Sequence, residues 1–218
     1  MKKEKNNKKL ILLVVIILVV ALGAGGLMLL LGREKAPLQE SSSDSASLLS
    51  GKHYVQIDIA EYGTIIAELD ADIAPITVTN FVNLVENGFY DGLTFHRIIS
   101  GFMIQGGDPN GNGTGGSGQN IKGEFRSNGV ENDLAHDRGV LSMARSAAKD
   151  SASSQFFIMH EKASHLDGEY AAFGKVLTGM EVVDSICQRV PVTDYNGTVA
   201  KANQPVITCM KIIEKPVE

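Results

Sequence analysis

The hydrophobic and polar positions divide the chain into parts of different character. An uncharged apolar run of 22 residues occupies 10–31 and follows the lysine-rich residues 1–9. Residues 32–52 are mostly polar or small, and such a composition buries too little apolar area to order itself. From residue 53 to 218, short apolar stretches alternate with glycine-rich turns. We therefore predict a basic tail, an apolar segment, a serine-rich linker and one folded domain.

The run at 10–31 is long enough for a membrane helix, since about 20 apolar residues cross the hydrocarbon core. Five lysines and one glutamate precede it, and positive flanks stay on the cytoplasmic side. A cleavable signal peptide is the alternative, but its apolar region is usually about 7–15 residues long. Small residues at 21–26 resemble a cleavage site, yet the apolar run continues through 27–31. We expect a single-pass signal-anchor in the cell membrane with an extracytoplasmic domain, or else secretion after cleavage.

The start of the folded domain predicts a hairpin followed by a helix. Apolar and polar residues alternate over 55–59, as in a half-buried strand. Residues 64–69 are its predicted partner across a turn at 61–63. Over 75–86 the apolar residues recur on one helical face, and Pro75 suits a first helical turn.

The remainder of the domain predicts a β-rich fold. Several short strands with glycine-rich turns are expected between 95 and 176. A second helix is predicted from Thr178, because Thr178 and Glu181 have capping-box spacing. A last strand is predicted over 206–213. Many short strands with only two helices favour a closed antiparallel β-barrel.

Composition and charge narrow the possible functions. The net charge of -5 combines +4 at residues 1–9 with -9 after residue 32, where 15 basic and 24 acidic residues lie. An acidic domain is a poor match for nucleic acid, which requires a basic face. The two cysteines, Cys187 and Cys209, have no C-x-x-C spacing, which argues against a zinc ribbon or a thioredoxin-like site. One disulfide and two buried thiols are both compatible with the sequence.

Three patterns that resemble chemical motifs are interpreted as structural. Residues 111–116 fit G-x-G-x-x-G but do not lie between a strand and a helix, so a surface loop is expected. His160 and His165 are five residues apart, whereas a zinc-protease helix requires a spacing of four. No G-x-S-x-G elbow is present. We therefore expect no metal, no cofactor and no hydrolase triad.

Three β-rich segments carry the functional prediction. Residues 95–108 match F-H-R-x-I-x-G-F-M-x-Q-G-G-D, 139–145 contain S-M-A, and 154–158 read S-Q-F-F-I. Together with L-D-G at 166–168, they closely resemble the cyclophilin family of peptidyl-prolyl cis/trans isomerases over residues 53–214. The resemblance implies an eight-stranded antiparallel barrel capped by two α-helices. It also implies proline-containing polypeptides as substrates, and we expect a monomer.

The resemblance also implies roles for individual residues. Arg97 matches the catalytic arginine of the family. The substrate-binding positions carried over are Phe102, Met103, Gln105, Ala144, Arg145, Gln155, Phe157, His165, Leu166 and Tyr170.

Three of these positions depart from the best-studied cyclophilins. His165 replaces a tryptophan associated with tight cyclosporin binding, so we expect weaker binding of that drug. Tyr170 replaces a histidine and is still able to line the pocket. Arg145 replaces an asparagine and is expected to add a positive charge at the groove edge.

The chemistry of proline isomerisation explains why an arginine suffices. Rotation about the amide faces a barrier of about 18–20 kcal/mol, and no covalent bond has to break. In the twisted amide the prolyl nitrogen regains a lone pair, to which the permanently protonated Arg97 can donate. Such a donor accelerates rotation only if it binds the twisted state best. We expect isomerisation during folding of exported proteins; the alternative is a non-catalytic proline-peptide-binding or holdase module.

Overall fold

The computed structural model describes residues 47–217. The predicted basic tail, the apolar run and most of the linker lie outside this range. Among the described residues, none of the helices has the length and apolar character that crossing a bilayer requires. The end of the linker contacts the domain, since Leu49 N donates to Thr79 Oγ1 (2.8 Å) and Gly51 N to Asp72 Oδ1 (2.7 Å).

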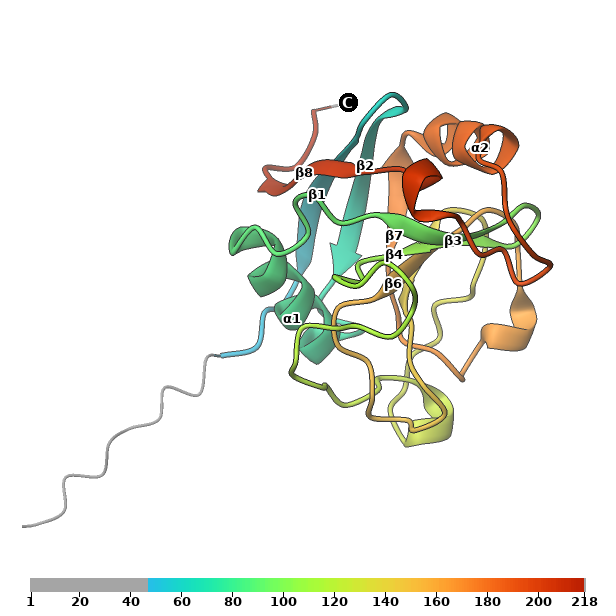
Figure 1. Ribbon diagram of the computed structural model, residues 1–218. Helices are drawn as coiled ribbons and strands as arrows, with labels where there is room; N and C mark the ends of the chain where they lie inside the picture. The colour runs from blue at the N-terminus through green and yellow to red at the C-terminus, as the bar shows by residue number, and fades with distance from the viewer. Residues whose placement is uncertain (1–46, 218) are drawn as a thin grey trace, which may run out of the picture. The chain divides into compact units, whose positions relative to one another are not determined.

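The core of the fold is one antiparallel sheet of eight strands (Figure 1), in the order β3-β4-β6-β5-β7-β2-β1-β8. The strands are β1 (Lys52–Ile59), β2 (Gly63–Asp70), β3 (Phe95–Ile99), β4 (Met103–Gly106), β5 (Val140–Met143), β6 (Phe156–Met159), β7 (Ala172–Thr178) and β8 (Ile207–Ile213). The predicted number and antiparallel direction of the strands are confirmed.

The edge strands β3 and β8 are joined by fewer backbone hydrogen bonds than a fully closed barrel requires. Within residues 47–217, the link between these edges is an isolated bridge between Thr94 and Val206, the residues just before the two strands, where Phe95 N donates to Pro205 O (3.0 Å). Ile207 N donates to Leu93 O (2.8 Å) beside it. The sheet is therefore a curved half-barrel whose edges are joined at this bridge, and the predicted closed barrel is not formed.

Helix α1 (Pro75–Glu86) has the bounds that the sequence predicts. Its N-cap residue Ala74 makes no side-chain cap bond, so the first amides need acceptors from elsewhere. The buried carboxylate of Glu124 accepts from Ile76 N (3.0 Å) and Thr77 N (2.7 Å). A distant acidic side chain thus caps α1, which packs against β2 and β8.

Helix α2 (Met180–Arg189) begins later than predicted, and the capping box is wrong. Thr178 is the last residue of β7 and pairs with Ile66, so it belongs to the sheet and is not the N-cap residue of α2. Gly179 is the N-cap residue instead, at φ 97°. A Cβ at Gly179 would lie 2.4 Å from the carbonyl oxygen of Thr64, so only glycine fits this passage from strand to helix.

The interior contains two hydrophobic clusters. The larger one lies between the sheet and the helices and includes Phe81, which contacts Phe156 and Phe173 with ring centroids 5.4 Å and 5.0 Å apart. The smaller one contains Met103 and Phe157 and lies beneath the site described below. Three short 3-10 helices complete the fold, namely η1 (Arg126–Asn128), η2 (Ser164–Leu166) and η3 (Lys201–Asn203).

Cys187 and Cys209 are both free, so the alternative of a disulfide between them is not realised. Burial raises the pKa of the Cys187 thiol to about 11, which keeps it protonated near neutral pH.

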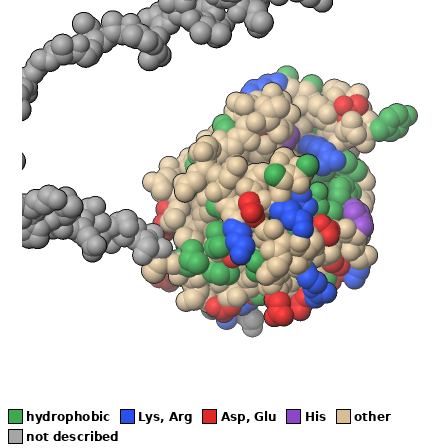
Figure 2. Space-filling model, turned by 90° about the horizontal axis from the view of Figure 1, so that it is seen from below, with side chains coloured by type: hydrophobic (Ala, Val, Ile, Leu, Met, Phe, Trp, Pro, Cys, Tyr) green, Lys and Arg blue, Asp and Glu red, His purple; other side chains and the backbone are tan. Residues whose placement is uncertain are grey.

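On the face shown in Figure 2, basic and acidic side chains are interspersed, so this face has no large area of a single charge sign.

Two buried histidines differ in how their rings are satisfied. His96 on β3 is 4% exposed, and neither ring nitrogen has a hydrogen-bond partner in the described chain. His136 is also buried, but it bonds Asp167 through Nδ1 and Ser142 through Nε2, both at 3.0 Å. Burial lowers the pKa of both imidazoles. Both rings are therefore neutral in the folded protein at neutral pH.

This difference predicts unequal effects of two leucine substitutions. Because the unfolded histidine binds protons more readily, each lowered pKa makes stability fall as the pH drops below about 6.5. His96→Leu should leave the unfolding free energy at pH 7.5 within about 1 kcal/mol and reduce its loss on acidification to pH 5.5. His136→Leu should cost about 2 kcal/mol at pH 7.5, because the buried Ser142 hydroxyl is left unpaired and Asp167 keeps only the bond from the backbone N–H of residue 136. Urea unfolding at both pH values measures this, and an unchanged acid sensitivity in His96→Leu would contradict it.

Candidate active site

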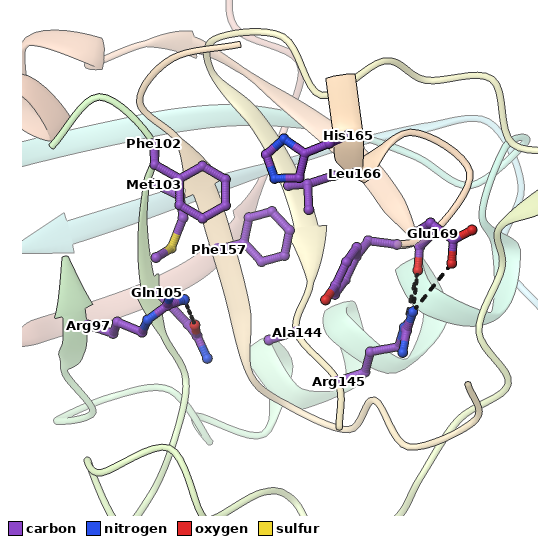
Figure 3. A pocket seen from close by; sticks show the side chains of 11 residues that line it. Arg97, Phe102, Met103, Gln105, Ala144, Arg145, Phe157, His165, Leu166 and Glu169 are labelled. Atoms are coloured by element: carbon purple, nitrogen blue, oxygen red, sulfur yellow. Dashed lines mark hydrogen bonds and ion pairs between the residues drawn. The ribbon is translucent and has the colours of Figure 1, made fainter. Parts of the chain in front are cut away.

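A pocket of about 520 Å³ opens where β3, β4 and β6 meet the loops after β5 and before β7 (Figure 3). Ten of the predicted site residues line it together with Glu169; the full set is Arg97, Phe102, Met103, Gln105, Ala144, Arg145, Phe157, His165, Leu166, Glu169 and Tyr170. The remaining predicted residue, Gln155, lies in the adjoining pocket. The structure thus brings the predicted residues together.

Strand register places the central side chains in one row. Arg97 on β3 is opposite Gln105 on β4, and Gln105 is opposite Phe157 on β6. Residues opposite one another in antiparallel strands point to the same face of a sheet. Alternation along β4 adds Met103 to that face. Residues far apart in the sequence therefore share one surface.

The pocket floor is apolar and its outer wall is aromatic. Met103, Phe157 and Leu166 are buried members of the smaller hydrophobic cluster. Phe102 stands at the turn between β3 and β4, and its ring stacks on His165 with centroids 5.7 Å apart and planes at 28°. In Figure 3 these two rings lie side by side above the floor. The cavity therefore suits a small apolar ring.

Arg97 is fixed on one side and available on the other. Its Nε donates to the carbonyl oxygen of Asn196 (2.8 Å) and its Nη1 to Gln105 Oε1 (3.2 Å). The Nη2 group makes no hydrogen bond to the described chain. Burial lowers the pKa of the guanidinium, but arginine begins so high that it stays protonated. A rigidly held cation thus has a free donor at the pocket.

A chain of amide groups sets the orientation of Gln105. Its Nε2 donates to Gln155 Oε1 (2.9 Å), and Gln155 Nε2 donates to the carbonyl oxygens of Gly113 (3.1 Å) and Gly115 (2.8 Å). Each amide uses its NH₂ group toward the glycine loop, so each oxygen points toward Arg97. The loop at 111–116, which the sequence predicts as a plain surface loop, therefore supports the cation indirectly.

Arg145 is far less free than its sequence position suggests. Its guanidinium lies 4.6 Å from the ring centroid of Tyr170 and 5.1 Å from that of Phe125. It donates to the carbonyl oxygen of Glu169 (2.9 Å from Nη2), and its side chain is only 11% exposed. The Glu169 carboxylate lies 3.8 Å away. The expected extra charge at the groove edge is therefore sandwiched between rings and partly neutralised, and Arg145 supports Tyr170.

Comparison with known proteins identifies the family of the domain. The family model described as "Cyclophilin type peptidyl-prolyl cis-trans isomerase/CLD" matches residues 54–213. The chain belongs to this family. This cyclophilin has peptidyl-prolyl cis-trans isomerase activity.

Individual relatives agree with this assignment. Peptidyl-prolyl cis-trans isomerase B of Bacillus subtilis is 54% identical over 114 residues, which cover 52% of this chain and 76% of that protein. The isomerase of Synechococcus elongatus is 52% identical over 115 residues, covering 53% and 74%. Among solved structures, a Cryptosporidium parvum cyclophilin superimposes with a TM-score of 0.66 at 32% identity, over 76% of this chain and 100% of that one.

The cyclophilin domain has a second pocket beside the first. It has a volume of about 400 Å³ and shares Gln105, Ala144 and Arg145 with the first pocket. Its walls are the glycine loop from Gly113 and the serine-rich residues 146–153. Sequence reasoning missed it, because glycine and serine carry no chemical signature. The two pockets together form an elongated groove.

Behind the pocket floor lies a buried polar network. The His136 ring, bonded to Asp167 and Ser142, stacks on Phe157 with centroids 6.1 Å apart and planes at 20°. Ser142 is fully buried, so its hydroxyl cannot attack a substrate. The network resembles a hydrolase triad only in its composition, and it supports the back of Phe157.

Proposed function

We propose that this cyclophilin catalyses X-Pro isomerisation by holding the proline ring in the apolar pocket while Arg97 stabilises the twisted amide. The observation that carries the proposal is the Nη2 group of Arg97, which has no hydrogen-bond partner within residues 47–217 and lies beside the floor formed by Met103 and Phe157. No covalent bond is made or broken, so positioning and one charge-assisted hydrogen bond are sufficient chemistry.

The order of events follows from the shape of the site. Burial of the proline ring against Met103, Phe157 and Leu166 restrains one side of the X-Pro bond. The rest of the peptide remains free to rotate in the open groove. As conjugation is lost, the prolyl nitrogen becomes a hydrogen-bond acceptor, and Arg97 is already in place to donate. Such a preorganised donor lowers the barrier because it needs no reorganisation during the rotation.

The second pocket extends this proposal to the substrate. A peptide with its proline in the first pocket can continue across Ala144 into the second, since that residue lines both. A related structure from Cryptosporidium parvum, at a TM-score of 0.65 and 33% identity, is described in the presence of the dipeptide Ala-Pro. We propose extended proline-containing segments of unfolded chains as substrates.

An exchange experiment distinguishes catalysis from binding alone. Two-dimensional NMR exchange on a proline-containing peptide, with the full-length chain at catalytic concentration, should show cis/trans exchange well above the uncatalysed rate, which takes tens to hundreds of seconds. Titration of the same peptide measures its affinity separately. Peptide binding without faster exchange would favour a non-catalytic or holdase module.

The location of the domain is a separate proposal, and it rests on sequence alone. The apolar run at 10–31 and the lysines before it support a signal-anchor with the isomerase on the extracytoplasmic side, where it would assist folding of exported proteins. Protease added to intact cells should remove the domain while leaving a short membrane-bound fragment. A mature chain that starts near residue 27 and accumulates in the medium would contradict the anchor.

A further inference from the structure

His160 lies just outside the pocket, and both of its ring nitrogens have partners. It directly follows β6 and its side chain is 15% exposed. Nδ1 accepts a hydrogen bond from the backbone N–H of Gly101 (2.8 Å), and Nε2 lies 3.2 Å from Asp184 Oδ1 on α2. Because Nδ1 is the acceptor, the ring proton resides on Nε2, which faces the Asp184 carboxylate.

The hydrogen bond from Gly101 to His160 gives the amide of a tight turn the acceptor that the turn itself lacks. Phe102 N donates to Ile99 O (3.0 Å), which makes Ile99 to Phe102 a β-turn with Gly101 at its third position, at φ 80°. A β-turn of this kind uses only its first carbonyl and last amide. The amide of Gly101 therefore needs an acceptor from elsewhere, and His160 supplies it.

The carbonyl of Phe102 is held by the same segment. The backbone N–H groups of His160 and Glu161 donate to Phe102 O at 2.9 Å and 3.3 Å. His165, five residues further on, stacks on the Phe102 ring. The segment 160–165 thus contacts the backbone on both sides of Phe102 and also its side chain.

The imidazole of His160 is itself held from behind. Arg138 forms a two-pronged pair with the Asp184 carboxylate, with Nη2 at 2.7 Å and 2.8 Å from its oxygens. Its Nη1 donates to the carbonyl oxygen of His160 (2.7 Å). Ring and backbone of His160 are therefore fixed by one network that also reaches α2.

We propose that His160 is a positioning residue that fixes Phe102 as the outer wall of the proline pocket. This inference rests on the pocket being the proline site, as proposed above. The imidazole touches no substrate; it acts through the turn that carries Phe102. The wall binds the proline ring alike in both planar isomers and in the twisted state, so its loss should weaken binding more than it slows rotation.

Two isosteric substitutions separate the roles of the two ring nitrogens. In His160→Asn, the Oδ1 atom takes the place of Nδ1 and can still accept from Gly101. In His160→Gln, the terminal amide takes the place of Nε2 and can still reach Asp184, but the acceptor for Gly101 is lost. KM and kcat are obtained by NMR line-shape analysis of the full-length chain with a proline peptide.

The His160→Asn and His160→Gln variants are expected to differ in KM. His160→Gln and His160→Ala should raise KM about 5-fold, the equivalent of one lost hydrogen bond, with kcat within about 2-fold of the parent. His160→Asn should keep KM within about 2-fold. Equal effects of the Asn and Gln variants, or a fall in kcat at constant KM, would overturn the proposal.

A readout that needs no activity separates this inference from the proposed function. Amide hydrogen exchange at Gly101 should be slow in the parent and in His160→Asn, and fast in His160→Gln and His160→Ala. If Gly101 behaves in this way but the parent does not accelerate isomerisation, the proposed function fails while the turn contact stands. Equally slow exchange in all four proteins would refute the contact itself.

Discussion

Replacement of Arg97 by alanine is expected to lower kcat/KM for a proline-containing peptide by about 100- to 1,000-fold, the usual effect of deleting a preorganised donor. The physical reason is the free Nη2 group, because Asn196 and Gln105 occupy the other side of the guanidinium. Ground-state affinity should change by less than about 3-fold, since the apolar floor remains. NMR exchange rates and peptide titration measure the two quantities independently.

Arg97→Lys is the matched control for this experiment. Lysine keeps the positive charge but lacks the planar fork that lets one cation serve two anchors and a substrate together. We expect an intermediate loss of about 10-fold. If Arg97→Ala retained activity within about 3-fold of the parent, the assigned mechanism would be wrong. If affinity fell as far as the rate, Arg97 would bind the substrate uniformly and would not act on the barrier.

The parts of the fold that could be predicted from sequence are those with local causes. The hairpin β1–β2 and helix α1 follow from the spacing of apolar residues within a few turns of chain, and α1 has the predicted bounds. The site residues were predicted through a long motif, and strand register then places them in one pocket.

The features that sequence reasoning missed depend on partners distant in the chain. Thr178 has a capping-box neighbour, but its pairing with Ile66 outweighs that local preference. Arg145 was expected to add a positive charge at the groove edge, but its guanidinium packs against the rings of Phe125 and Tyr170. The sparse contact between β3 and β8 likewise depends on how the whole sheet curves, which no local pattern encodes.

Asn196 is another such feature, and its turn leads to a second large expected effect. Gly197 stands at φ 80°, and a Cβ added there would lie 2.2 Å from the carbonyl oxygen of Ile98 on β3. Gly197→Ala should therefore destabilise the domain by about 3 kcal/mol, which combines left-handed strain with displacement of the turn. Because Asn196 O anchors Arg97, kcat/KM of the folded fraction should also fall by about 10-fold or more.

Gly129→Ala separates strain from displacement. Gly129 has nearly the same backbone angle, φ 77°, but a Cβ there would meet no atom within 4 Å. It should cost only about 1 kcal/mol and leave activity unchanged. Thermal unfolding gives both stabilities, and exchange rates at 15 °C, where both variants stay folded, give the activities. Equal stabilities would show that the turn yields without clash, and a fully active Gly197→Ala would show that Arg97 does not need the carbonyl of Asn196 to hold its Nη2 group at the pocket.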